Sequence, residues 1–332
     1  MAEYRENLPQ LGDELFLTDG GIETTLTFHE GAILPYFASF VPLADEAGTV
    51  MLRRYFERYA RLAQEEELGL VLETPTWRAN PDWAIRLGYD AAALARATRR
   101  SVDLLFDVRR RFETDATPIV ISGNLGPRGD GYVPGARMSA GEAQEYHALQ
   151  IETFAGTKAD MVAAFTMNYV EEAVGIARAA KAAAMPVAIS FTVETDGRLP
   201  SGPSLREAIE ATDEATGGYP VYYMINCAHP THIEPALGSP GPWRDRIRGL
   251  RANASRRSHQ ELDESVDLDA GDPDQLAREY RDLRESLRNL TVVGGCCGTD
   301  HRHVAAIARA LRPASASITA TNGTQASAEP MA

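Results

Sequence analysis

Three cysteines are the residues of this chain whose type and spacing point most directly to chemistry. Cys296 and Cys297 are adjacent and lie in the segment Gly-Gly-Cys-Cys-Gly-Thr at 294–299, while Cys227 follows the apolar run 221–225. Three thiolates form a soft ligand set that suits Zn²⁺ and leaves one of four tetrahedral positions open, as catalytic zinc sites do. The cysteines therefore predict one zinc site with room for a further ligand.

Other roles for these side chains are less consistent with the pattern. Buried cysteines are often ordinary core residues, but a pair flanked by glycines at the end of a strand is an unusual core position. Adjacent cysteines make a strained disulfide and lack the C-x-x-C spacing of a redox pair. Histidines that follow the cysteines could complete a mixed Cys/His site, although histidines in loops are more often solvated or helix-capping. They are His229, His232, His301 and His303.

Each cysteine follows one of eight apolar runs that alternate with helical stretches along the chain. The runs cover 15–19, 70–74, 118–122, 160–165, 186–191, 221–226, 247–251 and 290–293. The helices are predicted at 50–69, 90–115, 140–159, 170–184, 274–288 and from about 300 onward. This alternation predicts a single (β/α)8 barrel. An open doubly wound sheet is the alternative, but no G-x-G-x-x-G follows the first run.

The predicted barrel explains why distant cysteines would meet. The carboxyl ends of barrel strands converge on one rim, where the chemistry of such folds is found. Cys227 ends the sixth run, and the pair Cys296 and Cys297 ends the eighth. The barrel domain is expected to span 1–312, with an exposed polar excursion at 255–274 and a disordered tail at 313–332, where no apolar period occurs.

Composition limits the partners. The 332-residue chain carries a formal net charge of −14, which disfavours nucleic acids and anionic membranes because these are bound through clustered Lys and Arg. No apolar run approaches the roughly 18 to 20 residues of a membrane-spanning helix, and the N-terminus lacks the pattern of a signal peptide. We expect a cytoplasmic enzyme whose partners are small molecules.

Short motifs at five predicted strand ends, together with the cysteines, give the chain a resemblance to a known family over roughly 11–312. They are Thr-Asp-Gly-Gly at 18–21 with Thr24 and Leu26, Glu-Thr-Pro-Thr-Trp at 73–77, Gly-Asn-Leu-Gly-Pro at 123–127, Ser-Phe-Thr at 190–192 with 196–205, and Asn226-Cys227 with 294–299. The chain resembles the zinc-dependent homocysteine S-methyltransferases, which include betaine-homocysteine and S-methylmethionine-homocysteine methyltransferases.

The resemblance implies a function and a site. Cys227, Cys296 and Cys297 would hold Zn²⁺, with the homocysteine sulfur as fourth ligand and methionine as product. The zinc-activated thiolate would displace a methyl group from a sulfonium or ammonium donor. Asp19 would lie near the amino group of the acceptor, and the remaining substrate contacts would come from Gly20, Gly21, Thr74, Thr166 and Asn226.

One position departs from the family pattern. Where the family carries a Glu-Thr pair at the end of the fourth strand, this chain has Phe165-Thr166. The change removes a charge-assisted hydrogen bond to the acceptor's amino group, worth roughly 1.5 to 3 kcal/mol. Either another acid such as Glu73 or Glu194 replaces it, or the acceptor is not a plain amino acid thiol.

Several functions therefore compete. Homocysteine methylation leads, with the same chemistry on a different thiol or selenol as its nearest alternative. A zinc-dependent barrel hydrolase is a third reading, although thiolate ligands make zinc a weaker activator of water than histidine does. A non-catalytic metal-binding protein is a fourth. The sequence leaves open the oligomeric state and the methyl donor, with S-methylmethionine, S-adenosylmethionine and betaine as candidates.

Overall fold

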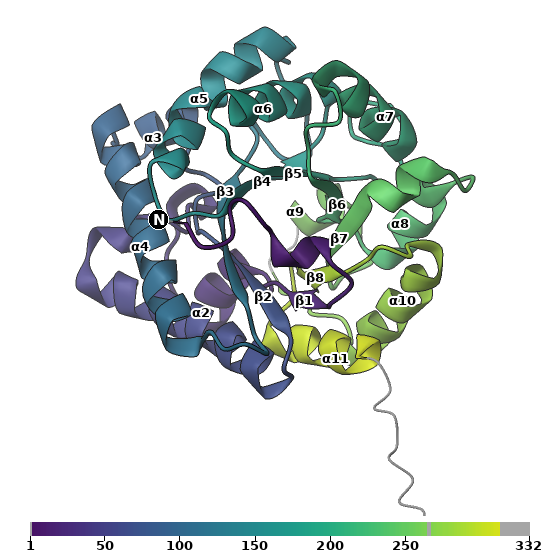
Figure 1. Cartoon of the computed structure of the whole chain (residues 1–332), viewed down its shortest axis with the longest axis horizontal. Helices are drawn as coiled ribbons and strands as arrows, with labels where there is room; N and C mark the ends of the chain where they lie inside the picture. Colours follow the sequence, from purple (N-terminus) through teal and green to yellow (C-terminus); the bar gives the residue numbers. More distant parts are fainter. Residues whose placement is uncertain (1, 264–266, 313–332) are drawn as a thin grey trace, which may run out of the picture.

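The computed structural model describes residues 2–263 and 267–312, which form a closed barrel of eight parallel strands. The strands pair in sequence order, and β1 pairs with β8 to close the barrel (Figure 1). The single (β/α)8 barrel expected from the sequence is thus confirmed. Its strands are β1 Phe16–Leu17, β2 Gly69–Glu73, β3 Ile119–Leu125, β4 Met161–Met167, β5 Val187–Phe191, β6 Tyr222–Asn226, β7 Ile247–Ala252 and β8 Val292–Gly295.

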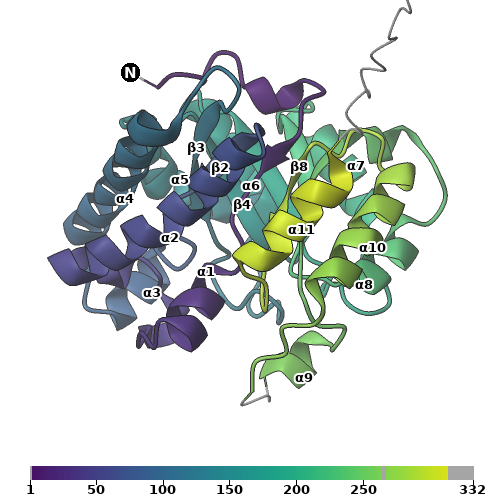
Figure 2. The ribbon, with the colours of Figure 1, turned by 90° about the horizontal axis from the view of Figure 1, so that it is seen from below.

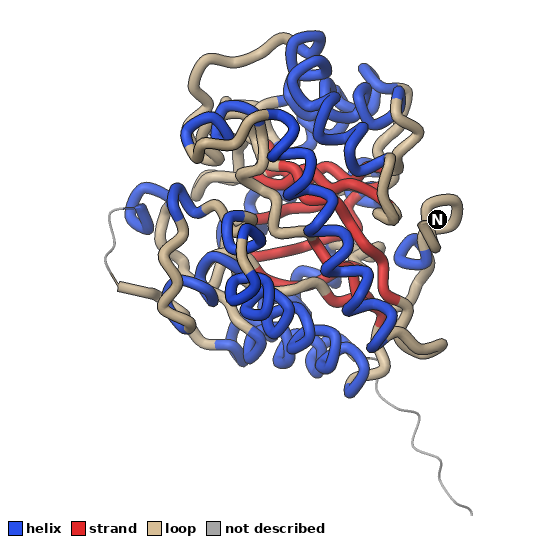
Figure 3. The backbone as a smooth tube through the Cα atoms, turned by 90° about the vertical axis from the view of Figure 1, so that its left-hand side faces the viewer, coloured by secondary structure: helices blue, strands red, loops and turns tan. Residues whose placement is uncertain are grey.

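The helices form a ring around the strands (Figure 1) and cover the outer faces of the sheet in the side view (Figure 3). They are α1 Ile22–Thr24, α2 Glu46–Glu65, α3 Pro81–Arg86, α4 Ala91–Phe112, α5 Ala140–Ala155, α6 Val170–Ala182, α7 Leu205–Thr216, α8 Pro230–Leu237, α9 His259–Asp263, α10 Pro273–Ser286 and α11 His301–Leu311. All six predicted helices are present, with ends shifted by a few residues. The largest shift is in α2, which starts at Glu46 because the Asp45 side chain accepts a hydrogen bond from Gly48 N and caps it.

Local sequence also explains other helix ends. Ser139 and Ser204 begin α5 and α7 with capping boxes, in which the serine hydroxyl and the Glu three residues later satisfy each other's backbone N–H groups. Helix α7 ends at Gly217, whose φ of 68° is left-handed and favours glycine. These signals place the helix boundaries without help from the barrel.

Two apolar layers stabilise the barrel. Inside it, side chains such as Phe16, Val71, Val120 and Val292 form one buried cluster. A second and larger cluster fills the space between the outer faces of the strands and the helices. Strands covered on both faces read as continuous apolar runs, which is why the runs in the sequence predicted them.

The two ends of the barrel differ. Helix α9 projects on the side of the molecule opposite the N-terminus (Figure 2), at the carboxyl ends of the strands. The expectation of an exposed excursion at 255–274 is wrong for Ser255 and His259, which are buried because they pack over this end. The predicted tail 313–332 lies outside the described residues. Within the described ranges, no helix has the length and apolar character needed to cross a membrane.

Candidate active site

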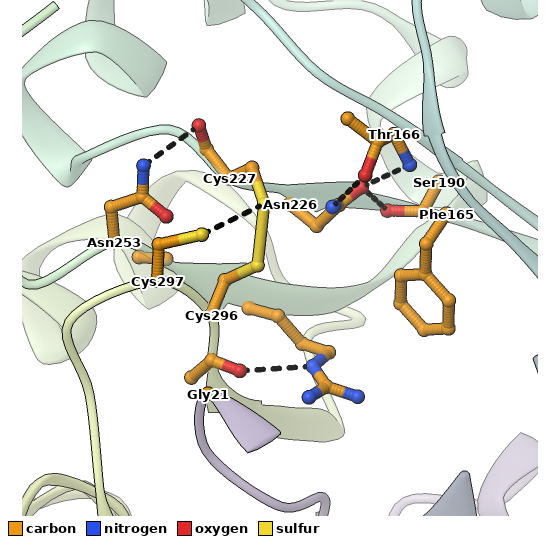
Figure 4. Close-up of a disulfide and its surroundings, with 12 residues drawn as sticks. Gly21, Phe165, Thr166, Ser190, Asn226, Cys227, Asn253, Cys296 and Cys297 are labelled. Carbon is orange, nitrogen blue, oxygen red and sulfur yellow. Dashed lines mark hydrogen bonds between the residues drawn. A yellow bond between two sulfur atoms is a disulfide. The ribbon is translucent and has the colours of Figure 1, made fainter. Parts of the chain in front are cut away.

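The three cysteine sulfurs meet at the carboxyl end of the barrel. Cys227 follows β6, and Cys296 and Cys297 follow β8. Their sulfur atoms all lie within 4.8 Å of one another. Cys227 and Cys296 are joined as a disulfide, and Cys297 Sγ lies 3.9 Å from Cys227 Sγ (Figure 4). The adjacent pair is therefore not the bonded pair, and the convergence predicted from strand order is present.

Strand β7, which lies between β6 and β8, holds the cysteine backbones in place. Cys227 N donates to Arg251 O at 3.1 Å, and Cys296 N donates to Ala252 O at 2.8 Å. Asn253 Nδ2 donates to Cys227 O at 3.0 Å. Cys227 itself has a φ of 54°, an uncommon value for a residue with a side chain. Arg251 and Ala252, consecutive residues of β7, thus position the cysteines that follow both of its neighbouring strands.

A close backbone approach holds the loop after β1 against the cysteines. A Cβ atom on Gly21 would lie 2.6 Å from Cys296 O, so only glycine fits there. Gly298, directly after the cysteines, has a φ of 79° and favours glycine for conformational reasons. Within the cysteine segment, a Cβ on Gly294 would collide with Thr18 of the β1 loop and one on Gly295 with Thr299, so close packing also requires these two glycines.

The donor set fits a tetrahedral thiophilic metal. Zinc bound to sulfur at about 2.3 Å places its ligands roughly 3.8 Å apart, close to the separation of Cys227 and Cys297. Two sulfurs joined as a disulfide cannot both ligate as thiolates, so only the reduced protein could hold a metal with all three sulfurs. Among the described residues, no histidine belongs to the cluster. His229 instead contacts Thr231 and Glu279, and burial lowers its pKa to about 4.

A cavity of about 580 Å³ opens beneath the cysteines. Every residue that the sequence singled out for substrate binding lines it, namely Asp19, Gly20, Gly21, Thr74, Thr166 and Asn226. The structure thus brings the whole predicted set together with the three cysteines. The role of each residue in binding substrate stays a prediction.

Asn226 organises the wall of the cavity next to Cys227. Its Oδ1 accepts hydrogen bonds from Thr166 N at 2.9 Å and Ser190 Oγ at 2.6 Å, and its Nδ2 donates to Thr166 Oγ1 at 2.9 Å (Figure 4). The β4–β5 register is irregular between Ala164 and Met167, and Thr166 has a φ of 62°. Asn226 therefore replaces ladder hydrogen bonds that this bulge removes.

A buried ion pair forms the floor of the cavity. Arg251 Nη2 lies 2.6 Å from Asp19 Oδ1, and Tyr55 Oη donates to Asp19 Oδ2 at 2.8 Å. Burial raises the pKa of Asp19, and the positive charge of Arg251 opposes that shift. The Arg251 guanidinium also lies over the Phe165 ring, 5.1 Å from its centroid. Asp19 is therefore already paired with a cation of the chain itself.

Of the two acids that could replace the family's glutamate, Glu73 is the one that lies at the cavity. It is buried at the cavity wall, and its Oε2 has no hydrogen-bond partner among the described residues. Burial raises its pKa from 4.5 to about 8, against the pull of Arg251, so it is largely uncharged near neutral pH. Glu194, the other acid considered, does not line the cavity and contacts His259 at 3.1 Å.

Three functional candidates were not predicted from the sequence: His259, Tyr132 and Arg251. His259 Nε2 lies within hydrogen-bond distance of Cys227 O, and the Tyr132 ring stacks on His259 at 4.0 Å. Tyr132 Oη lies 3.7 Å from Cys297 Sγ. No local motif marks either residue: Tyr132 lies in the loop between β3 and α5, and His259 begins the short helix α9 in the connection between β7 and α10. Arg251 could have been found from its position, because it is the last residue of the predicted strand 247–251, and Cys227 likewise lies at the end of a predicted strand.

The raised pKa of Glu73 predicts a pH-dependent stability. Between pH 4.5 and 8 the unfolded chain ionises Glu73 while the folded chain keeps it protonated, so the wild type loses up to about 1.4 kcal/mol of stability per pH unit. Glu73→Gln avoids this loss. We expect its free energy of unfolding, measured in urea, to rise relative to wild type from pH 5 to 8 and to level off above. Exposed Glu214→Gln is the control, and a constant difference for Glu73→Gln would contradict the assignment.

Fold and site together define a (β/α)8-barrel enzyme with a three-cysteine centre at the carboxyl ends of its strands. The sequence model of the homocysteine S-methyltransferase family matches residues 16–311, so the chain belongs to that family. Membership makes it a methyltransferase that acts on a thiol, as the resemblance implied. No curated protein sequence matches the chain.

Solved structures support the same architecture. The homocysteine methyltransferase MmuM from Escherichia coli in its oxidized form is 21% identical, with a TM-score of 0.72 over 92% of this chain and 99% of that one. Its metallated form is 20% identical, with a TM-score of 0.71 over 92% and 98%. At these identities the likeness establishes the fold, and the chemistry is argued from the residues of this chain.

Proposed function

We propose that this chain is a zinc-dependent S-methyltransferase that transfers a methyl group from a sulfonium or ammonium donor to a small thiol. The convergence of Cys227, Cys296 and Cys297 on one point above the cavity is the observation that carries the proposal. Zinc held by these sulfurs would lower the pKa of an acceptor thiol from its usual value of about 8.5 and keep it as the thiolate near neutral pH.

The reaction is a direct displacement. The bond from the donor's sulfur or nitrogen to its methyl carbon breaks as the new bond from the acceptor sulfur to that carbon forms. The electron pair leaves with the donor heteroatom, which loses its positive charge, and the thiol proton passes to solvent. Removing a cationic donor from water favours this loss of charge.

The chain's own residues prepare the cavity for that step. Asn226 holds the bulge at Thr166 in place, and His259 with Tyr132 covers the cysteines from above. At the cavity mouth, Phe28, Tyr36 and Phe37 are 52%, 51% and 58% exposed, and the rings offer π faces to a cationic donor. These contacts support a cavity that can hold a cationic donor at its aromatic mouth and an acceptor thiol beside the cysteines.

Homocysteine is the acceptor that the family description suggests, with methionine as product. A different thiol or selenol is the second candidate, and the pairing of Asp19 with Arg251 favours it. A zinc hydrolase is less well supported, because the described histidines lie outside the cysteine cluster. S-methylmethionine, S-adenosylmethionine and betaine are the donors to compare.

Product mass spectrometry tests the proposal. Reduced protein loaded with one equivalent of zinc is incubated with each donor and each thiol, and we expect a methylated thiol from at least one pair. Removing zinc with a chelator should lower the rate at least about 100-fold, because the thiol then stays mostly protonated and unpositioned. Adding zinc back should restore it. Transfer that persists undiminished without metal, or no methylated thiol from any pair, would refute zinc-dependent methyl transfer.

A further inference from the structure

The hydrogen bonds of Arg251 leave one part of its guanidinium facing the cavity without an acceptor. Its Nε donates to Gly295 O at 3.0 Å, and its Nη2 donates to Gly20 O at 3.1 Å and lies 2.6 Å from Asp19 Oδ1. Within 2–263 and 267–312, the contacts of Arg251 to the protein use Nε and Nη2 and leave Nη1 without an acceptor, and Arg251 lines the cavity. A buried guanidinium with an unused donor recognises an anion.

The acids around the floor do not supply a free negative charge for a cationic ligand. Asp19 is paired with Arg251 and also accepts from Tyr55. Glu73 is kept largely protonated near neutral pH because burial raises its pKa. Glu23 accepts a hydrogen bond from Ser39, and removal from water raises its pKa as well. An ammonium group placed here would meet a fixed cation and would lose its hydration without an unpaired carboxylate to replace it.

The surface next to the guanidinium is apolar. Phe165 covers one side of Arg251 and is itself buried. A hydrocarbon chain can pack on the ring while its carboxylate reaches Nη1. The cysteine sulfurs line the same cavity, so a thiol at the other end of such a chain can approach them.

We propose that the acceptor is a thiol that carries a carboxylate and no ammonium group, with the carboxylate bound by Arg251. The inference rests on the proposed thiol methylation and narrows its acceptor class. Arg251 then acts as a specificity-determining residue, and Asp19 serves to hold Arg251 rather than to bind the substrate.

Three thiols that differ by one group at a time test this. 4-Mercaptobutyrate is homocysteine without its amino group, and 3-mercaptopropylamine is homocysteine without its carboxylate. Isothermal titration of reduced protein, with and without one equivalent of zinc, measures binding independently of turnover. We expect 4-mercaptobutyrate to bind at least about 10-fold more tightly than homocysteine and roughly 100-fold more tightly than 3-mercaptopropylamine, the range of one charge-assisted hydrogen bond.

Substitution of the arginine should remove the preference. In Arg251→Met the ratio between 4-mercaptobutyrate and 3-mercaptopropylamine should fall to within about 3-fold, because the carboxylate loses its charged partner. The double variant Arg251→Met with Asp19→Asn keeps the charge balance if the single variant does not fold. Arg248→Met, on the same strand but bonded to Gly12 O away from the cavity, should keep the wild-type ratio.

The outcomes separate this inference from the proposed function. Homocysteine or 3-mercaptopropylamine binding as tightly as 4-mercaptobutyrate overturns the acceptor class, even if methyl transfer occurs. The expected order of binding without methyl transfer from any donor supports the acceptor site and overturns the proposed reaction. Failure of all three thiols to bind overturns the acceptor class, whereas the proposed methyl transfer is decided by the product analysis with the full set of donors and thiols.

Discussion

Replacing Cys296 by serine is expected to abolish stoichiometric zinc binding and to lower methyl transfer on the order of 1000-fold or more. A neutral serine hydroxyl is a poor substitute for a thiolate, and the remaining pair of sulfurs leaves the metal with half of its four positions unfilled by the protein. Without the metal, the acceptor thiol is mostly protonated near neutral pH. Zinc content by elemental mass spectrometry and single-turnover rates measure the two effects. The reduced variant should still fold, because Cys296 contributes no buried apolar packing comparable to the barrel core.

The matched control is His229→Gln, which changes a potential ligand close to Cys227. Because His229 contacts Thr231 and Glu279 instead of the cysteine cluster, this variant should keep one equivalent of zinc. Cys227→Ser and Cys297→Ser should behave as Cys296→Ser does. A cysteine variant that keeps full zinc content, or loss of zinc in His229→Gln, would show that the ligand set is not the three sulfurs.

Replacing Arg109 by methionine is expected to lower the free energy of unfolding by about 3 to 5 kcal/mol while leaving zinc binding intact. Arg109 Nη1 lies 2.7 Å from Asp160 Oδ2, and both side chains are buried. Asp160 also accepts backbone hydrogen bonds from Glu3, Tyr4 and Ile121, which join the N-terminal segment to β3. Removing the arginine leaves a buried carboxylate without its cation. Urea unfolding of the reduced protein measures the change.

Arg110→Met is the matched control, because Arg110 is adjacent to Arg109 on α4 and its side chain is exposed. It should change stability by less than about 0.5 kcal/mol. A double variant, Arg109→Met with Asp160→Asn, should recover part of the loss because no unpaired charge remains.

The Arg109–Asp160 pair lies at the amino ends of β3 and β4, where barrels place stabilising residues and not catalytic ones. Equal effects of the two arginine variants, or loss of zinc from folded Arg109→Met, would contradict this separation.

The strands and the cysteine site could be predicted from the sequence for clear physical reasons. Strands buried on both faces are apolar along most of their length, so apolar runs mark the barrel strands. The run 247–251 forms β7 although two arginines interrupt it. Parallel strands of a barrel end on one rim, so knowing that Cys227 and Cys296 follow strands was enough to bring them together. The strand-end residues Thr74 and Asn226 reach the same cavity by the same rule.

Other features depended on contacts that strand order does not specify. Arg251 on β7 pairs with Asp19 after β1, with only β8 between the two strands, and no local pattern links two residues so far apart in the chain. The uncharged state of Glu73 follows from its burial, which exists only in the folded protein. The polar sequence around His259 resembles an exposed loop, yet hydrogen bonds to Cys227 and Glu194 hold it over the site.

The amino-acid sequence by itself therefore determined the barrel, the meeting of the three sulfurs and the departure at Phe165. Apolar runs, strand order and strand-end motifs can all be read from residues that are close together along the chain. The tertiary structure alone decided the charge around the cavity. It pairs Asp19 with Arg251 and keeps Glu73 protonated near neutral pH. Long-range side-chain pairing and desolvation set these charges, and both arise only when distant strand ends are packed around one cavity.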